Sequence, residues 1–319
     1  MKDAPSLLRK GLKLSHLRLM AALSETGQIG LAADRLGIAQ PAASRLLAEV
    51  ERITAQPLHV RTGRGITLTP MGEALAARAA RVVTEIRDAE REIVEIGGGN
   101  MGHVRIGSVT GPALDRVLPA LRTARLALPG VTAEVTVAPS DLLAQQLLSG
   151  RMDFAIGRMP EGMETQLSLS DPIDTEPVAL MVRRGHRLAQ QDAVSPQDLM
   201  DYDWVMPPAE ALLARAVTER LRALDLPAPS QRLATTSFLL TLALLQQSNA
   251  IAPLARAVCE RFAAGPDSPY TILPIDLGIV VEPYGLLTRA GAILTPVAQR
   301  LAGLVLAGQS ERTVPALDR

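Results

Sequence analysis

The sequence predicts an all-helical N-terminal unit, one long helix and a C-terminal α/β domain. Three observations lead to this fold class. Short helical patterns fill residues 13–70 and end in a Gly- and Thr-rich stretch, an unbroken apolar repeat fills residues 71–96, and short strand-like runs alternate with helices from residue 101 onward. The length of 319 residues fits about two domains. The expected boundaries are, in order, 1–70, 71–98 and 99–319.

Composition limits the class of protein. The hydrophobic share of 47% is sufficient for sizeable cores, and no apolar run reaches the ~18 residues that a membrane span needs. The basic residues 1–13 lack the apolar segment of a secretory signal. The only cysteine, Cys259, excludes an intrachain disulfide, a CxxC redox pair and a multi-cysteine zinc site. We therefore expect a cytoplasmic protein with no metal and no resident cofactor.

The zero net charge hides an asymmetry along the chain. Residues 1–70 hold ten basic and five acidic side chains, a net charge of +5, so the remaining 249 residues carry −5. A basic end on an otherwise acidic chain indicates binding to nucleic acid, although five charges also fit ordinary solvated surface. Aromatic residues make up only 2% of the chain. Because single strands are bound by stacking bases on aromatic side chains, duplex DNA is the expected nucleic acid.

The N-terminal unit has the pattern of three helices, at residues 17–24, Ile29–Leu36 and Gln40–Thr54. Gly37 suits the left-handed cap that ends the second helix, and Pro41 lies in the first turn of the third, where its missing N–H costs nothing. Two short helices, a Gly-containing turn and a third helix match the DNA-binding helix-turn-helix. A three-helix bundle that does not bind DNA is the alternative.

Candidate DNA contacts lie at the start of the third helix and on the hairpin that follows it. A recognition helix meets base edges with its first turns, where Arg can bond guanine in a fork and Gln can bond adenine. Residues 57–69 read as a hairpin, or wing, whose Gly-rich tip carries two arginines suited to phosphates or the minor groove. The candidates are Gln40, Pro41, Ser44 and Arg45 on the helix, and Arg61 and Arg64 on the wing.

A long helix is expected to begin at Thr69, which can cap it, with Pro70 in the first turn. Its apolar positions alternate in steps of three and four residues, the a/d pattern of a coiled-coil seam. The chain has no second heptad helix, so the expected partner is the same helix of a second copy. Packing within the chain is the alternative. The expected seam residues are Leu75, Ala79, Val82, Ile86, Ala89 and Ile93.

The C-terminal region has a β-α-β pattern. Strands are expected at 103–109, 131–137, 154–157, 177–182, 204–206, 251–252 and 280–287, with helices between them. Strands that alternate with helices imply a parallel sheet with both faces covered. Ligands in such folds bind beyond the carboxyl ends of the strands, near helix N-termini.

The sequence resembles the LysR-type transcriptional regulators at residues 36–45 (LGIAQPAASR), 57–58 (PL) and 68–72 (LTPMG). The order of the parts that follow is similar too. The resemblance implies a winged helix-turn-helix, a linker helix and a two-lobed domain like that of periplasmic binding proteins. The lobes are expected at about 101–174 with 291–308, and at about 175–290. A finer similarity, at 102–126, 150–158 and 183–188, is to the subgroup near regulators of sugar-binding-protein and aromatic-acid genes.

The resemblance implies a regulator that binds promoter DNA as dimers and tetramers and senses a small-molecule co-inducer between its lobes. RNA polymerase is a further partner to consider. Two residues depart from the family pattern. Ala39 stands where a Ser usually caps the recognition helix, so either Gln40 or Ser44 compensates or the helix start is softer. His59 stands where a wing aromatic is usual; half-buried packing is expected there, and a DNA contact is the alternative.

Polar groups that end a strand or start a helix are the candidate effector contacts. Arg158 can pair with an anionic ligand or form a salt bridge between the lobes, and plain helix capping is the alternative for Ser108 to Thr110 and for Ser140. Several helix N-termini at one cleft favour a small carboxylate, aromatic acid or sugar acid, although Asp141 argues against a strongly anionic site. The candidates are Ser108, Val109, Thr110, Ser140, Arg158, Pro207, Thr236 and Ser237.

The sequence carries no catalytic motif. The four histidines lie far apart without HExxH or GxSxG, and the glycines at 97–99 are not followed by the Lys-Ser/Thr pair of a P-loop. Cys259 is expected to be a core thiol. A regulator, not an enzyme, is therefore expected. Two alternatives stay open: a two-lobed solute-binding protein or enzyme with an incidental N-terminal bundle, and a DNA-binding protein that responds to no effector.

Overall fold

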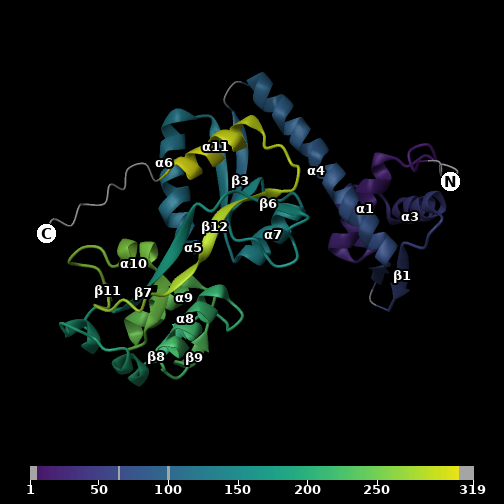
Figure 1. The fold of residues 1–319 in the computed structure, drawn as a ribbon. Helices are drawn as coiled ribbons and strands as arrows, with labels where there is room; N and C mark the ends of the chain where they lie inside the picture. Colours follow the sequence, from purple (N-terminus) through teal and green to yellow (C-terminus); the bar gives the residue numbers. More distant parts are fainter. Residues whose placement is uncertain (1–5, 64, 99–100, 309–319) are drawn as a thin grey trace.

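The computed structural model describes residues 6–63, 65–98 and 101–308 of the chain. A helical unit lies at one end and an α/β domain at the other, and helix α4 (Pro70–Gly98) connects them (Figure 1). None of the described helices is both long enough and apolar enough to cross a membrane.

The N-terminal unit consists of three helices and a hairpin. Helices α1, α2 and α3 cover Leu14–Thr26, Ile29–Leu36 and Gln40–Thr54, and strands β1 (His59–Thr62) and β2 (Gly65–Leu68) pair antiparallel. Helix α1 is longer than predicted because His16 Nδ1 accepts a hydrogen bond from the Lys13 amide before the first turn, at 3.1 Å, and Gly27 ends the helix with φ 62°. The unit is closed by one apolar core, to which α1, α2, α3 and the start of α4 all contribute.

Helix α4 has 29 residues and begins against the hairpin. Thr69 Oγ1 donates to the Pro57 carbonyl at 2.7 Å and accepts from the Gly72 amide at 3.1 Å, which confirms the predicted cap. The helix ends at Gly98, within the Gly-rich stretch expected to stop it. The glycine at 72 is required by packing, because a Cβ there would lie 2.0 Å from the Leu58 carbonyl oxygen.

Replacing Gly72 by Ala is expected to lower the midpoint of thermal unfolding by several degrees. The added methyl meets backbone atoms, which can move aside only by displacing the hairpin from α4, and such overpacking costs about 1–3 kcal/mol. Calorimetry on Gly72→Ala and on Gly303→Ala tests this, because a Cβ at Gly303 meets nothing within 4 Å. Equal midpoints for the two variants would contradict the close approach.

The α/β domain has two lobes. The first contains strands β3 (Gly102–Ser108), β4 (Val131–Val137), β5 (Phe154–Gly157) and β6 (Leu167–Leu169), and helices α5 (Thr110–Pro112), α6 (Leu118–Ala127), α7 (Ser140–Leu148) and α11 (Pro296–Ala307), with a π-helical turn at Ala113–Val117. The second contains β8 (Asp203–Met206), β9 (Ser230–Ala234), β10 (Ala252–Ala255) and β11 (Tyr270–Ile272), and α8 (Leu212–Ala223), α9 (Phe238–Gln247) and α10 (Arg256–Phe262). Two strands of ten residues, β7 (Asp174–Arg183) and β12 (Val280–Arg289), join the lobes.

One sheet runs through both lobes in the order β10-β7-β12-β5-β3-β4. Strand β3 pairs parallel with β4 and β5, as predicted, but β7 runs antiparallel to β10 and β12, and β12 antiparallel to β5. The prediction of a wholly parallel sheet is therefore wrong. The chain crosses between the lobes once in each direction, so the two crossing strands oppose each other.

The crossing also shifts the expected lobe boundary at residue 290. Residues 285–289 of β12 pair with β5 and β6 in the first lobe, whereas the start of the same strand pairs with β7. The predicted second lobe, 175–290, is therefore too long at its C-terminal end. Strand β12 belongs to both lobes, which makes it one of the two segments about which they could move.

Candidate functional site

The start of helix α3 presents its side chains to solvent. Gln40, Pro41 and Arg45 are exposed and Ser44 is half-buried. The Arg45 guanidinium lies back along its own helix, with Nε donating to the Pro41 carbonyl at 3.4 Å, and no other described residue bonds to it. Ala39 precedes the helix in extended conformation and provides no side-chain cap. The helix therefore begins without the Ser hydroxyl that the resemblance to LysR-type regulators leads us to expect at this position.

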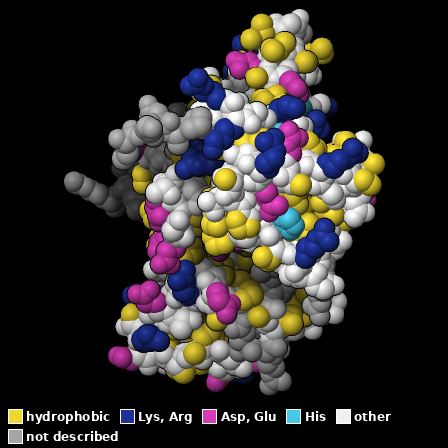
Figure 2. All heavy atoms as spheres, turned by 90° about the vertical axis from the view of Figure 1, so that its right-hand side faces the viewer, with side chains coloured by type: hydrophobic (Ala, Val, Ile, Leu, Met, Phe, Trp, Pro, Cys, Tyr) yellow, Lys and Arg dark blue, Asp and Glu magenta, His cyan; other side chains and the backbone are white. Residues whose placement is uncertain are grey.

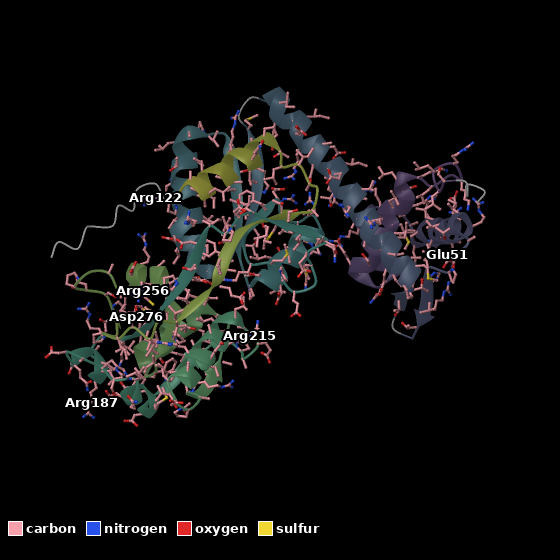
Figure 3. The ribbon with its side chains drawn as sticks, viewed as in Figure 1. Glu51, Arg122, Arg187, Arg215, Arg256 and Asp276 are labelled. Carbon is pink, nitrogen blue, oxygen red and sulfur yellow. The ribbon has the colours of Figure 1, made fainter. Side chains whose placement is uncertain are left out.

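The wing is fixed to the far end of α3 by Glu51. Its carboxylate accepts a hydrogen bond from the Leu58 amide at 2.8 Å and lies 2.9 Å from His59 Nδ1. Figure 3 shows Glu51 at the outer end of the N-terminal unit, near the hairpin. His59 is half-buried, as predicted. Arg61 is exposed on β1, and Arg64 lies outside the described residues. The sequence did not predict that Glu51 holds the wing. The local signal for this role is weak: a carboxylate in the last turns of a helix that precedes a hairpin.

The outer face of α4 carries exposed apolar side chains. Val82, Ile86 and Ile93 are 43%, 37% and 70% exposed, and Ala89 is exposed as well. Hydrophobic side chains at the top of Figure 2 cover the end of this helix. Four of the six predicted seam residues thus share an open face, as an unpaired coiled-coil position requires.

Ala79 is a correction to the predicted seam. Its side chain is fully buried in the core of the N-terminal unit, and Leu75 packs against the same core. The heptad pattern continues through these positions. In the first turns of α4, however, helix α1 covers this apolar face, so it is not available to a second copy. Periodicity gives the spacing of the apolar residues and not which neighbour covers them.

The inner face of α4 is joined to the first lobe by a network of ion pairs. Arg91 donates to both carboxylate oxygens of Asp153, at 2.6 and 3.1 Å, and Arg105 donates to Asp153 from its guanidinium and its amide, both at 2.8 Å. Arg91 and Arg289 also each donate to Asp88 at 2.6 Å. Burial alone would raise the pKa of Asp153, but the hydrogen bonds from Arg91 and Arg105 outweigh it and lower that pKa. The network joins α4 to the first lobe by charged hydrogen bonds.

The predicted effector residues fall into two groups. In the first lobe, Ser140 Oγ accepts a hydrogen bond from the Arg158 amide at 3.1 Å. The buried Ser108 hydroxyl donates to the Val109 carbonyl at 2.9 Å, and the side chain of Thr110 is exposed. The second group, in the other lobe, comprises Pro207, Thr236 and Ser237. A bond of 3.0 Å from the Thr235 amide to the Met206 carbonyl brings their two loops together, and Ser237 caps α9 by accepting from the Leu240 amide at 3.3 Å.

Arg158 already has an internal partner. It is 7% exposed, its Nη2 donates to the Glu176 carboxylate at 2.7 Å, and its Nε donates to the Glu282 carbonyl at 2.6 Å. Glu176 lies on β7 and Glu282 on β12, so Arg158 links the first lobe to both crossing strands. The salt-bridge alternative is therefore the arrangement that the structure shows.

A pocket of about 180 Å³ lies beside the crossing strands, between α5, β7 and α10. Four carboxylates line it, from Asp115, Asp174, Glu176 and Glu260. The one cation among its described lining residues, Arg256, pairs with Asp276 at 2.8 Å, and Figure 3 shows the two side by side in the second lobe. None of the eight predicted effector residues is among the lining residues of this pocket. Its charge does not suit an anionic effector.

Two family models together match most of the chain. Residues 14–73 match the bacterial regulatory helix-turn-helix protein, lysR family, and residues 97–310 match the LysR substrate binding domain. The HTH-type transcriptional regulator GbpR of Rhizobium radiobacter is 43% identical over 254 residues, which cover 79% of this chain and 84% of the relative. PcaQ of Agrobacterium fabrum, also an HTH-type transcriptional regulator, is 26% identical over 308 residues, 94% of this chain and 98% of the relative.

Solved structures of low sequence identity share the fold. A full-length OxyR variant from Pseudomonas aeruginosa is 18% identical, with a TM-score of 0.67 and coverage of 92% of this chain and 94% of that one. Full-length CbnR in complex with its target DNA is 20% identical, with a TM-score of 0.63 and coverage of 93% and 100%.

These matches confirm the resemblance at residues 36–72, and the relatives GbpR and PcaQ agree with the predicted subgroup. They also decide against the solute-binding and enzyme alternatives, because the family models and the relatives are regulators. The chain belongs to the LysR family of transcriptional regulators, with a winged helix-turn-helix for DNA and a two-lobed domain for a small-molecule effector.

Proposed function

We propose that the protein reads a two-fold-related promoter site as a dimer, with the first turns of α3 in the major groove. The observation that carries this is the exposure of Gln40 and Arg45 at the start of a helix inside the matched helix-turn-helix domain, 14–73. The wing then approaches the adjacent phosphates. The proposed contacts are Gln40, Pro41, Ser44 and Arg45 from the helix, and Arg61 and Arg64 from the wing.

The first test is a gel shift on DNA directly upstream of the gene, beside scrambled DNA, over a salt series. Tight and selective retention with a steep salt dependence supports sequence-specific regulation. Equal and weak retention of both DNAs would contradict an operator at that position.

Replacing Arg45 by Ala is expected to weaken binding to the selected site by about 1–3 kcal/mol, roughly tenfold or more, because a bidentate base contact is lost. Binding to scrambled DNA should change much less. The matched control is Arg52→Ala, since Arg52 is an exposed arginine in the last turns of the same helix, where its Nη2 lies 4.0 Å from Glu49. Equal losses on both DNAs would remove Arg45 from base readout.

The dimer is proposed to form through the open face of α4, at Val82, Ile86, Ala89 and Ile93. Tetramers would follow from contacts between effector domains, and RNA polymerase would be met at the promoter. Support for the dimer is the exposure of these apolar side chains along one seam. A cytoplasmic location is part of the same proposal.

The effector is proposed to be a small carboxylate, aromatic acid or sugar acid that binds between the lobes. The proposed contacts are Ser108, Val109, Thr110, Ser140, Arg158, Pro207, Thr236 and Ser237. Because Arg158 is engaged with Glu176, an anionic effector would have to exchange with that carboxylate, and the exchange would move β7 relative to the first lobe. A ligand shifts the equilibrium between lobe arrangements only by binding one of them better.

Thermal-shift screening of the full chain against carboxylic acids and sugar acids tests the effector proposal. Thr236→Ala should abolish a shift that the wild type shows, while Thr123→Ala, on an exposed face of α6, should retain it. If no compound shifts the midpoint of the wild type, the alternative of a DNA-binding protein without an effector would be favoured.

A further inference from the structure

A second pocket, of about 120 Å³, lies where the N-terminal unit meets the first lobe. Four arginines from four segments surround it: Arg18 on α1, Arg35 on α2, Arg87 on α4 and Arg151 after α7. The one acidic residue among its described lining residues is Glu25. The side chains around this pocket therefore carry a formal charge of +3, four guanidinium groups against one carboxylate.

The single carboxylate serves two of the four arginines. Glu25 Oε2 pairs with Arg35 from its own domain and lies 3.2 Å from Arg151 Nη2 of the effector domain. For Arg18 and Arg87 the described part of the chain supplies neither a hydrogen bond nor an ion pair. Two exposed guanidinium groups thus border the pocket without a partner among the described residues, beside two others that share one acceptor.

The side chains behind these arginines are small and buried. Ala21 and Ala22 are buried on α1. The chain after α7 approaches α4 so closely that a Cβ at Gly150, which has φ +68°, would lie 2.3 Å from Thr84 Oγ1. The pocket thus lies between α1 and the chain after α7, both of which are packed against α4. Its volume is below the ~300 Å³ at which pockets for drug-sized ligands begin.

We infer that this interdomain pocket binds a small multivalent oxyanion of the phosphate class. Guanidinium groups match phosphoryl oxygens with paired N–H donors, and each such charge-assisted bond is stronger than a neutral one. An anion here relieves the repulsion among four like charges that Glu25 alone balances only in part. Since the arginines come from both domains and from the linker helix, the bound anion connects the DNA-binding unit to the effector domain. The inference does not depend on the proposed DNA contacts.

The test is titration calorimetry of the full chain with inorganic phosphate at constant ionic strength, without DNA. Saturable binding that chloride does not reproduce is expected. Arg87→Ala and Arg18→Ala should each weaken it at least fivefold. Arg122→Ala, an exposed arginine on α6 far from this pocket (Figure 3), removes the same charge and should change it less than twofold.

Glu25→Gln provides the opposing measurement. It removes the competing carboxylate and frees Arg35 and Arg151, so phosphate should bind several times more tightly. If binding is not saturable, if Arg87→Ala and Arg122→Ala behave alike, or if Glu25→Gln does not tighten binding, the site does not exist. A parallel titration with glycerol 2-phosphate separates the sources of the ligand: comparable binding points to a phosphorylated metabolite, and binding of inorganic phosphate alone points to the free ion.

Discussion

Replacing Ile86 by Asp is expected to convert the protein from a dimer to a monomer at micromolar concentration. Ile86 lies on the open face of α4, in line with Val82 and Ile93. Two copies of the helix would bring two carboxylates together in an apolar seam, and buried like charges cannot be paired there. Light scattering should show the halved mass. Specific DNA affinity should fall roughly 100-fold or more, because each monomer reads one half-site without the gain from linked binding.

The matched control for this change is Val94→Asp. Val94 is 65% exposed on the same helix but lies one residue past a seam position, so the same charge points away from the partner. The control should remain a dimer. Leu75→Asp is unsuitable, because Leu75 packs against the core of the N-terminal unit. An unchanged mass for Ile86→Asp would show that the dimer forms elsewhere.

Replacing Asp153 by Asn is expected to be the most destabilising of the changes considered. The side chain of Asp153 is 4% exposed and binds Arg91 and Arg105, so the isosteric amide leaves two arginines around a site without its negative charge. Breaking a buried pair in this way costs about 3–5 kcal/mol. Urea unfolding should show the loss. Asp171→Asn, at an exposed position of the same lobe, should change the stability by less than about 0.5 kcal/mol.

The same residue gives a dependence on pH. The pKa of Asp153 in the folded state lies below the ordinary value of 3.8 for an Asp carboxyl. Its contribution to stability is therefore present above pH 3.8 and is lost as pH falls through the folded-state pKa. The difference in stability between wild type and Asp153→Asn should therefore be constant near neutral pH and shrink below about pH 4. A difference that does not change on acidification would contradict the charge-based account.

Local sequence signals determined much of the N-terminal unit. Gly37 ends α2, Thr69 and Pro70 start α4, and the residues of α2 and α3 follow the helical period, so the predicted α2 and α3 have the observed bounds. Three short strands escaped prediction, whereas those expected at 154–157 and 204–206 are present. Strands β6, β9 and β11 have three to five residues, and β6 and β11 pair at the edges of longer strands. Such short segments show too few alternations for a period of two to be detected.

The sequence by itself also determined the family, the outward side chains of α3 and the spacing of the α4 seam, because each depends on residues close together in the chain. Only the tertiary structure decided that Ala79 belongs to the protein's own core, that β7 and β12 pair antiparallel, and that Arg158 forms a salt bridge with Glu176. It alone gathered Arg18, Arg87 and Arg151 around Glu25, from positions up to 133 residues apart. Periodicity and capping act over a few residues, whereas the partner of a buried charge or the cover of an apolar face depends on which distant segments fold against it.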